Sequence, residues 1–253
     1  MPLLSYPGQV VPRRRVMLLQ LGQAPESFPT ELGDYKRWFE SSWDGPLELV
    51  DGRPGAGAPA LPDPRDFAGV IASGSPASLV TPEPPGWMDA AAELVRRAYD
   101  VGTPLLGVCF GHQLVGYAFG ARVINNAWGW EVGTRAIDVS EEGQRDPLFR
   151  GLPGRMRVNL THRDIIDPVG CPDSIRVLAG NDATALQAIA VGDHIWGVQF
   201  HPEICGTIMR GYINARRPML DLHHDCDELH ASSEDCPDAA ALMRNFKATV
   251  LTS

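Results

Sequence analysis

One cysteine of this chain stands where a nucleophile would be expected. The segment Gly107-Val-Cys-Phe-Gly111 places Cys109 between small residues, directly after an apolar run and before a stretch with helical periodicity. A nucleophile on such a tight strand-to-helix turn has a strained backbone, so its neighbours must be small. The N–H groups that open the following helix favour a thiolate and can stabilise an oxyanion. Cys109 is therefore the candidate nucleophile, although most free cysteines are simply small buried residues.

A thiol nucleophile needs a base, and Gly197-Val-Gln-Phe-His-Pro-Glu203 supplies one at the end of another apolar run. Pro202 restricts the backbone between His201 and Glu203, so the two side chains project in a defined relation. We predict that Glu203 holds one imidazole nitrogen while the other nitrogen faces the sulfur. A His-Pro-Glu run alone is more often a turn. Its pairing with Cys109 favours a site, because reactive groups gather beyond the carboxyl ends of strands in open α/β sheets.

The elements that must position these residues follow from hydrophobic patterning. Short, continuous apolar runs indicate buried parallel strands, and apolar residues at helical spacing indicate the helices between them. We predict strands over residues 16–21, 46–50, 67–72 and 104–108, and helices over 31–39, 87–100 and 111–119. Shorter strands near 135–139, 156–159, 176–179, 185–189 and 195–200 predict an antiparallel extension. The fold class is therefore α/β, with a doubly wound, mostly parallel sheet.

The length of 253 residues is within the range of one large α/β domain. We find no internal repeat or linker, although the segment 51–64 is rich in Gly, Pro and Ala and predicts an irregular loop. We expect a single domain over residues 1–253, with a core over about 16–217 and a polar, helical tail over 218–253. The tail contains a group of possible metal ligands, for which a solvated helical face is the favoured interpretation: His223, His224, Asp225, Cys226 and His230.

Composition limits the possible partners and compartments. The net charge of −9 argues against nucleic-acid binding, and we expect the only basic cluster, Arg13 to Arg15, to stay solvated. No run approaches the ~20 apolar residues that span a bilayer, and residues 1–12 lack the features of a signal peptide, so we expect no membrane association and a cytoplasmic protein. The five cysteines form no Cys-x-x-Cys pair, so disulfides and zinc are poorly supported. We expect no metal and no cofactor.

The motifs GVCFGHQ and GVQFHPE resemble those of the class I, triad-type glutamine amidotransferase family. Ser73-Gly-Ser-Pro76 matches the loop of that family that donates an oxyanion N–H, and the similarity spans roughly residues 16–217. The resemblance implies a flavodoxin-like sheet and hydrolysis of a γ-carboxamide through a glutamyl thioester. It further implies that Gly74 and Phe110 offer backbone N–H groups and that Gln113 binds the substrate.

A third segment, Asn159-Leu-Thr-His-Arg-Asp164, aligns with the family stretch Ser-His-Gly-Asp, which lines the α-amino and α-carboxylate end of the substrate. Here Thr161 replaces serine and Arg163 replaces glycine. By this alignment the guanidinium of Arg163 binds a carboxylate, and pairing with Asp164 or another surface carboxylate is the alternative. The His-Arg-Asp form resembles stand-alone relatives of the amidotransferase half of GMP synthase and γ-glutamyl peptidases. Glu131 resembles a family position near the pocket, with a loop salt bridge as the alternative.

Three functions remain open from the sequence. The first is a glutaminase, or the amidotransferase component of a larger enzyme, that releases ammonia from glutamine; since the chain has no GxxxxGK[ST] loop and no room for a synthetase domain, the acceptor chemistry would belong to a partner in trans. The second is a γ-glutamyl peptidase, which Arg163 favours. The third is a catalytically quiet binding or regulatory protein of the same fold.

Overall fold

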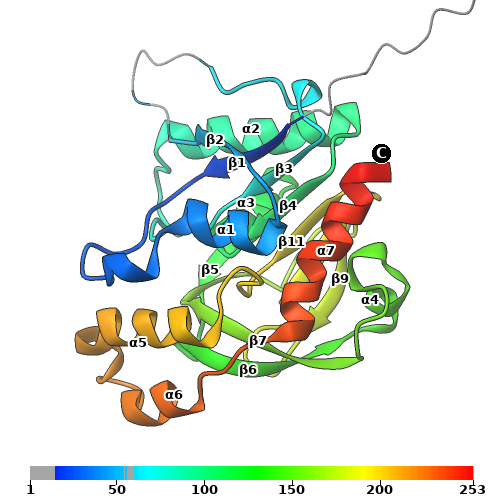
Figure 1. Ribbon diagram of the computed structural model, residues 1–253. Coiled ribbons are helices and arrows are strands. Elements are labelled where there is room, and N and C mark those ends of the chain that lie inside the picture. The colour runs from blue at the N-terminus through cyan, green and yellow to red at the C-terminus, as the bar shows by residue number, and fades with distance from the viewer. Residues whose placement is uncertain (1–14, 54, 56–59, 253) are drawn as a thin grey trace, which may run out of the picture.

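A central sheet of nine strands runs through the computed structural model, which describes residues 15–53, 55 and 60–252 (Figure 1). Its strand order is β2-β1-β3-β4-β11-β10-β9-β6-β7. The first five of these are parallel: β2 (Glu48–Asp51), β1 (Val16–Gln20), β3 (Gly69–Ala72), β4 (Leu105–Val108) and β11 (Ile195–Val198). The other four pair antiparallel: β10 (Ala188–Val191), β9 (Ile175–Gly180), β6 (Glu131–Val139) and β7 (Arg155–His162). The predicted mostly parallel sheet with an antiparallel extension is confirmed. The strand expected over 195–200 as part of that extension is β11, which instead pairs parallel with β4 and so belongs to the parallel half.

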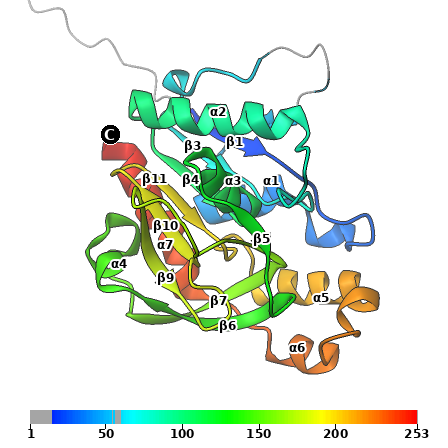
Figure 2. The same cartoon turned by 180° about the vertical axis from the view of Figure 1, so that it is seen from behind.

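Helices cover both faces of the parallel half of the sheet (Figures 1 and 2). The helices α1 (Tyr35–Trp43) and α7 (Pro237–Thr252) pack on one face, and α2 (Gly86–Val101) and α3 (Phe110–Ala118) on the other. Strand β1 shows why both faces must be covered, since Val16 and Leu18 enter the first apolar core while Met17 and Leu19 enter the second. The result is a three-layer, doubly wound arrangement.

Several boundaries differ from the prediction. The helix expected over 31–39 is a 3-10 turn at Thr30–Leu32 followed by α1, because the side chain of Asp34 accepts a hydrogen bond from the N–H of Arg37 and starts the α-helix there. The strand expected over 185–189 is β10, which pairs with β11 through Ala188–Val191. A second, two-stranded sheet of β5 (Val123–Asn125) and β8 (Asp164–Ile166) was not predicted, since each strand has only three residues.

The C-terminal part is helical, as expected, in α5 (Gly206–Leu220), α6 (Cys226–Ser232) and α7. The prediction of a polar tail was wrong for α7, because Leu242, Met243 and Phe246 are fully buried in the same core as α1. No helix in the described part of the chain is long and apolar enough to cross a bilayer. The segment 1–12, Arg13, Arg14 and part of the loop 51–64 lie outside the described residues.

Candidate active site

The carboxyl ends of three neighbouring strands bring the candidate site residues together. Strand β4 pairs with β3 on one side and with β11 on the other, with Gly107 opposite Ala72 and Val108 opposite Val198. The segments that leave these ends carry Gly74 after β3, Cys109 after β4 and His201 after β11. Parallel strands end at the same edge of a sheet, so residues far apart in the sequence become neighbours there.

Cys109 occupies the strained turn that the sequence predicts. Its φ is 54° and its ψ is −103°, and its N–H donates to the carbonyl oxygen of Val198 at 2.8 Å. A positive φ is costly for a residue with a side chain. The flanking glycines have no room for one: a Cβ on Gly107 would lie 2.3 Å from the carbonyl oxygen of Gly111, and a Cβ on Gly111 would lie 2.3 Å from that of Ala72. The turn therefore depends on glycine at both positions.

His201 and Glu203 form a buried pair in the segment that follows β11, the strand next to β4. Nδ1 of His201 is 2.7 Å from Oε1 of Glu203, and the side chains are 4% and 2% exposed. The N–H of His201 donates to the carbonyl oxygen of Asn159 at 2.9 Å, which ties it to β7. Its Nε2 is buried and has no hydrogen-bond partner among the described residues. One imidazole nitrogen is thus held by the carboxylate, and the other is left for a thiol or a substrate.

Gly74 lies close to the side chains of both Cys109 and His201. A Cβ built on Gly74 would be 3.4 Å from Cε1 of His201 and 3.6 Å from Cβ of Cys109. A glycine here leaves open the space between the thiol and the imidazole.

The electrostatics of His201 are dominated by its two neighbours. Burial alone would lower its pKa, but the charges of Glu203 and Cys109 outweigh burial and raise the pKa to about 10. The imidazolium form of His201 is therefore favoured at neutral pH. This is the charge state that activates a cysteine nucleophile.

A pocket of about 600 Å³ opens beside Cys109. Its lining includes three residues that the sequence assigned to substrate binding: Gln113, Thr161 and Arg163. The amide nitrogen of Gln113 donates to the carbonyl oxygen of Asp164 at 2.8 Å and to Oε1 of Gln199 at 3.2 Å, which holds its amide in one orientation. Phe110, which the sequence assigned to substrate binding together with Gly74, has a buried ring, and as the first residue of α3 its N–H has no partner within the helix.

Arg163 is exposed and forms no ion pair with any residue that the structure describes. The alternative of a pair with Asp164 is not found. The carboxylate of Asp164 instead accepts hydrogen bonds from Ser78 at 2.5 Å and from Asn125 at 2.6 Å. Arg163 thus remains available to a ligand at the rim of the pocket.

Three residues near the site were missed by the sequence, and of these only Arg216 lines the pocket. Arg216 of α5 lines the pocket and donates to Oγ1 of Thr161 at 2.7 Å. The hydroxyls of Tyr35 and Tyr212 are 3.0 Å apart and buried, and burial raises the pKa of Tyr35 to about 12, so both phenols stay protonated. No local spacing marks these residues, because α1 and α5 meet the site only through the tertiary fold.

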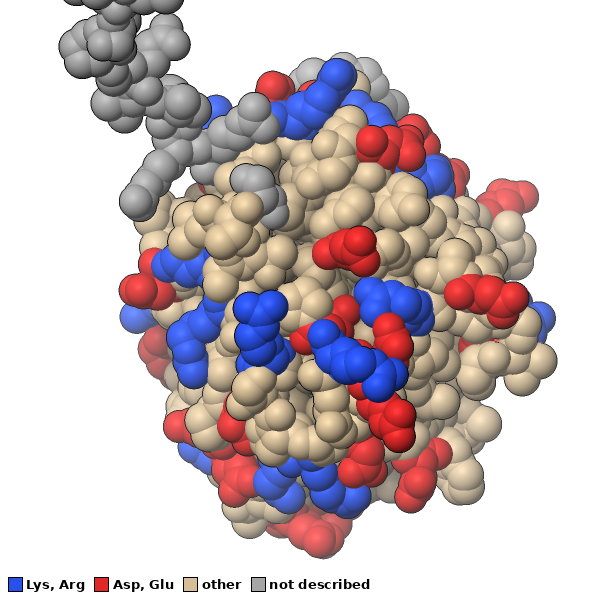
Figure 3. Space-filling model, turned by 90° about the vertical axis from the view of Figure 1, so that its right-hand side faces the viewer, with Lys and Arg blue, Asp and Glu red and all other residues tan. Residues whose placement is uncertain are grey.

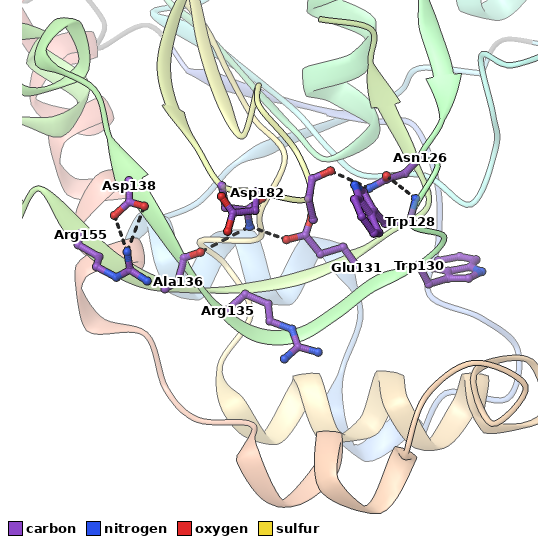
Figure 4. A pocket seen from close by; sticks show the side chains of 11 residues that line it. Asn126, Trp128, Trp130, Glu131, Arg135, Ala136, Asp138, Arg155 and Asp182 are labelled. Atoms are coloured by element: carbon purple, nitrogen blue, oxygen red, sulfur yellow. Dashed lines mark hydrogen bonds and ion pairs between the residues drawn. The ribbon is translucent and has the colours of Figure 1, made fainter.

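Glu131 does not line this pocket. Its carboxylate accepts hydrogen bonds from Asn181 at 2.6 Å, from Thr184 at 2.8 Å and from Gln187 at 3.0 Å, and is 3.1 Å from Nε2 of His162. Burial would raise its pKa, but these contacts outweigh it and lower the pKa. It lines a second hollow of about 370 Å³, together with Asn126, Trp128 and Asp182 (Figure 4).

The groups in the tail do not gather into a metal site. Within the described residues, no three His, Cys, Asp or Glu side chains are arranged to hold a metal ion. His223, His224, Asp225, Cys226 and His230 are therefore assigned no ligand role.

Comparisons with known proteins identify relatives of this arrangement. The family model for class-I glutamine amidotransferases matches residues 60–216. A glutamine-hydrolyzing GMP synthase of Thermomicrobium roseum is 37% identical over 154 residues, which are 61% of this chain and 26% of that protein. One subunit of the glutamine-hydrolyzing GMP synthase of Methanoculleus marisnigri is 35% identical over 116 residues, which are 45% of this chain and 60% of that subunit. The alignments thus cover less than two thirds of either relative.

The same fold occurs among solved structures. The crystal structure of a glutamine amidotransferase from Thermotoga maritima superposes with a TM-score of 0.74, covering 95% of this chain and 99% of that one at 19% identity.

Proposed function

Because this chain belongs to the class-I glutamine amidotransferase family, we propose that it hydrolyses the γ-carboxamide of glutamine to glutamate and ammonia. One observation carries the proposal: Cys109, the buried His201–Glu203 pair and Gly74 converge at one sheet edge, next to a pocket of about 600 Å³. A nucleophile, an oriented base and backbone N–H donors for the oxyanion are the parts that acyl transfer requires.

The reaction divides into two acyl transfers. The thiolate of Cys109 attacks the γ-carbonyl carbon, and the N–H groups of Gly74 and Phe110 stabilise the resulting oxyanion. The His201 imidazolium then protonates the departing nitrogen, which leaves as ammonia, and a glutamyl thioester remains. His201, now neutral, removes a proton from water, which attacks the thioester and releases glutamate and the thiolate. Glu203 stays ionised throughout and orients the ring.

The ammonia acceptor belongs to a separate synthetase in this proposal. The relative from Methanoculleus marisnigri is one subunit of a GMP synthase, which favours a synthetase on a separate chain. The present chain would supply ammonia in trans to such a partner.

A second candidate, a γ-glutamyl peptidase, uses the same residues on a different leaving group. Two arginines, Arg163 and Arg216, line the pocket, whereas the one α-carboxylate of glutamine requires only one cation. The other could bind the carboxylate of a peptide leaving group.

Purified protein incubated separately with glutamine and with γ-glutamyl dipeptides would distinguish these functions. Release of glutamate and ammonia from glutamine supports the first, and preference for dipeptides supports the second. Loss of both activities in Cys109→Ser would tie them to this site. If the wild type hydrolyses none of these substrates, either alone or with a synthetase partner, a catalytically quiet protein would be favoured.

Affinity labelling gives an independent test of the nucleophile. A glutamine-like diazoketone should modify Cys109 and spare Cys205, which is exposed and serves as the internal control. Burial raises the pKa of Cys226 to about 11 and that of Cys236 to about 12, so these thiols should react slowly. Labelling of Cys205 as fast as Cys109 would contradict the assignment.

A further inference from the structure

The guanidinium of Arg216 is held in the pocket by neutral groups. It donates to Oγ1 of Thr161 at 2.7 Å, and its Cζ lies 5.1 Å from the ring centroid of Trp130 and 5.2 Å from that of Tyr212. A hydroxyl and two aromatic faces restrict the orientation of the fork and contribute cation–π attraction, but they leave its positive charge uncompensated.

The neighbouring arginine, Arg217, differs because it has acidic partners. Arg217, the next residue of α5, lies 2.7 Å from a carboxylate oxygen of Asp227 and 3.8 Å from one of Asp221. For Arg216, no acidic partner is found among the residues that the structure describes. A guanidinium has five N–H donors, so most of those of Arg216 remain for a ligand. A partly buried cation without a counter-ion suits an anionic ligand.

We propose that Arg216 binds the α-carboxylate of the substrate, with Thr161 and Trp130 positioning its guanidinium. This rests on the proposed function, since it takes a γ-glutamyl group as the substrate. Arg216 and Cys109 line the same pocket, so a substrate whose γ-carbonyl meets the thiol can extend its α-carbon end toward the guanidinium. A planar fork pairs with a carboxylate through two parallel hydrogen bonds. The site would therefore select γ-glutamyl compounds with a free α-carboxylate.

Asp164 provides the opposite charge in the same pocket. Its carboxylate is fixed by Ser78 and Asn125 and is not neutralised by a cation among the described residues. A cation and a carboxylate lining one pocket suit a zwitterionic α-amino acid, with the α-ammonium near Asp164 and the α-carboxylate on Arg216.

Two truncated substrates separate these interactions. 4-Aminobutanamide is glutamine without its carboxylate, and glutaramate is glutamine without its α-amino group. The wild type should prefer glutamine over 4-aminobutanamide. In Arg216→Ala, kcat/KM for glutamine should fall by roughly ten- to a hundred-fold, mostly through KM, because the contact is made equally in the ground state and the transition state. The activity on 4-aminobutanamide should stay unchanged, so the preference is lost.

Matched variants control for structure. Arg217→Ala removes the neighbouring arginine of the same helix and should keep the KM and the substrate preference of the wild type. Arg216→Lys keeps the charge but not the fork, so it should recover only part of the affinity. If Arg216→Ala retains the wild-type KM and preference, the proposal is wrong; a loss in Arg163→Ala instead would move the carboxylate to Arg163.

A binding measurement separates this proposal from the proposed function. Titration calorimetry of glutaramate into Cys109→Ser needs no turnover, and Cys109→Ser/Arg216→Ala should bind it at least about ten-fold more weakly. If the wild type does not hydrolyse glutamine but Cys109→Ser shows this Arg216-dependent binding, the proposed function fails while carboxylate recognition stands. Equal binding by both variants overturns the recognition by Arg216.

Discussion

At the residue scale, the charge of His201 depends on Glu203. The 2.7 Å contact between their side chains holds the ring and, with Cys109, raises the pKa of His201 to about 10 against the effect of burial. Glu203 thus has two separable effects: it orients the ring and stabilises the imidazolium. An uncharged isostere such as Gln can keep the first, through its size and hydrogen bond, but not the second.

In the proposed mechanism His201 transfers protons, so His201→Ala should lower kcat by about 10²- to 10⁴-fold, while Glu203→Gln should retain more activity. Glu203→Gln should also move the alkaline limb of kcat/KM to lower pH. The sign follows from the raised pKa: the imidazolium is lost as pH rises through the pKa of His201, and without the carboxylate that pKa is lower. Steady-state pH profiles test both effects. An unmoved alkaline limb, or a greater loss in Glu203→Gln than in folded His201→Ala, would contradict the assigned roles.

At the element scale, the glycines of the strand-end turns have different functions. In Gly74→Ala the new methyl group makes ordinary contacts, 3.4 Å from Cε1 of His201 and 3.6 Å from Cβ of Cys109, so the fold should tolerate it. Activity should fall, because the methyl group occupies the space that the substrate carbonyl needs.

Gly111→Ala is the matched comparison. Its Cβ would lie 2.3 Å from the carbonyl oxygen of Ala72, so α3 must shift against β3, at a cost of roughly 1–3 kcal/mol. Urea unfolding and glutamine hydrolysis, measured on both variants, should separate a loss of activity from a loss of stability. A Gly74→Ala protein that is unstable, or fully active, would contradict the account of the open space at Gly74.

The packing of α3 on β11 predicts an acid sensitivity. His112 is fully buried in α3 beside Gly197, and burial, which the backbone of Gly197 and Leu186 only partly offsets, lowers its pKa to about 3. The unfolded chain therefore binds a proton that the folded chain excludes between about pH 6.5 and 3.

As pH falls from about 6.5 to 3, His112 alone should lower the free energy of unfolding by up to ~1.4 kcal/mol per pH unit. Urea unfolding of the wild type and of His112→Leu at several pH values tests this. The slope against pH, rather than the absolute stability, should be smaller in the variant, and parallel slopes would exclude His112 as the cause.

At the scale of the whole molecule, α7 closes the core. Figure 1 shows this last helix beside α1, and the ring of Phe246 lies 6.0 Å from that of Trp43 and 6.1 Å from that of Trp196. The domain boundaries, with a core ending near residue 217, stay a prediction, but the burial of α7 makes the tail part of what stabilises that core. On the face that Figure 3 shows, acidic and basic side chains are interspersed.

Phe246→Ala should lower the free energy of unfolding by roughly 3–5 kcal/mol, because it removes a fully buried ring from the core. Leu251→Ala, on the same helix but 64% exposed, should change it by no more than about 0.5 kcal/mol. Denaturant unfolding measures both. Equal effects would contradict the claim that the burial of Phe246 stabilises the core.

The sequence by itself determined the sheet class, the turn at Cys109 and the paired His201 and Glu203. These features are local, since a continuous apolar run marks a buried strand and both reactive groups lie within a few residues of a strand end. The short strands β5 and β8 left no such pattern, and the start of α1 depended on one capping side chain.

Only the tertiary structure decided what surrounds the reactive groups. Arg216 meets Thr161 across 55 positions of sequence, and Tyr35 meets Tyr212 across 177. The periodicity of a helix shows that it has an apolar face, but the rotation and docking of α5 and α7 depend on packing with distant elements. That packing places Arg216 in the pocket and buries α7, which was expected to be polar, in the core.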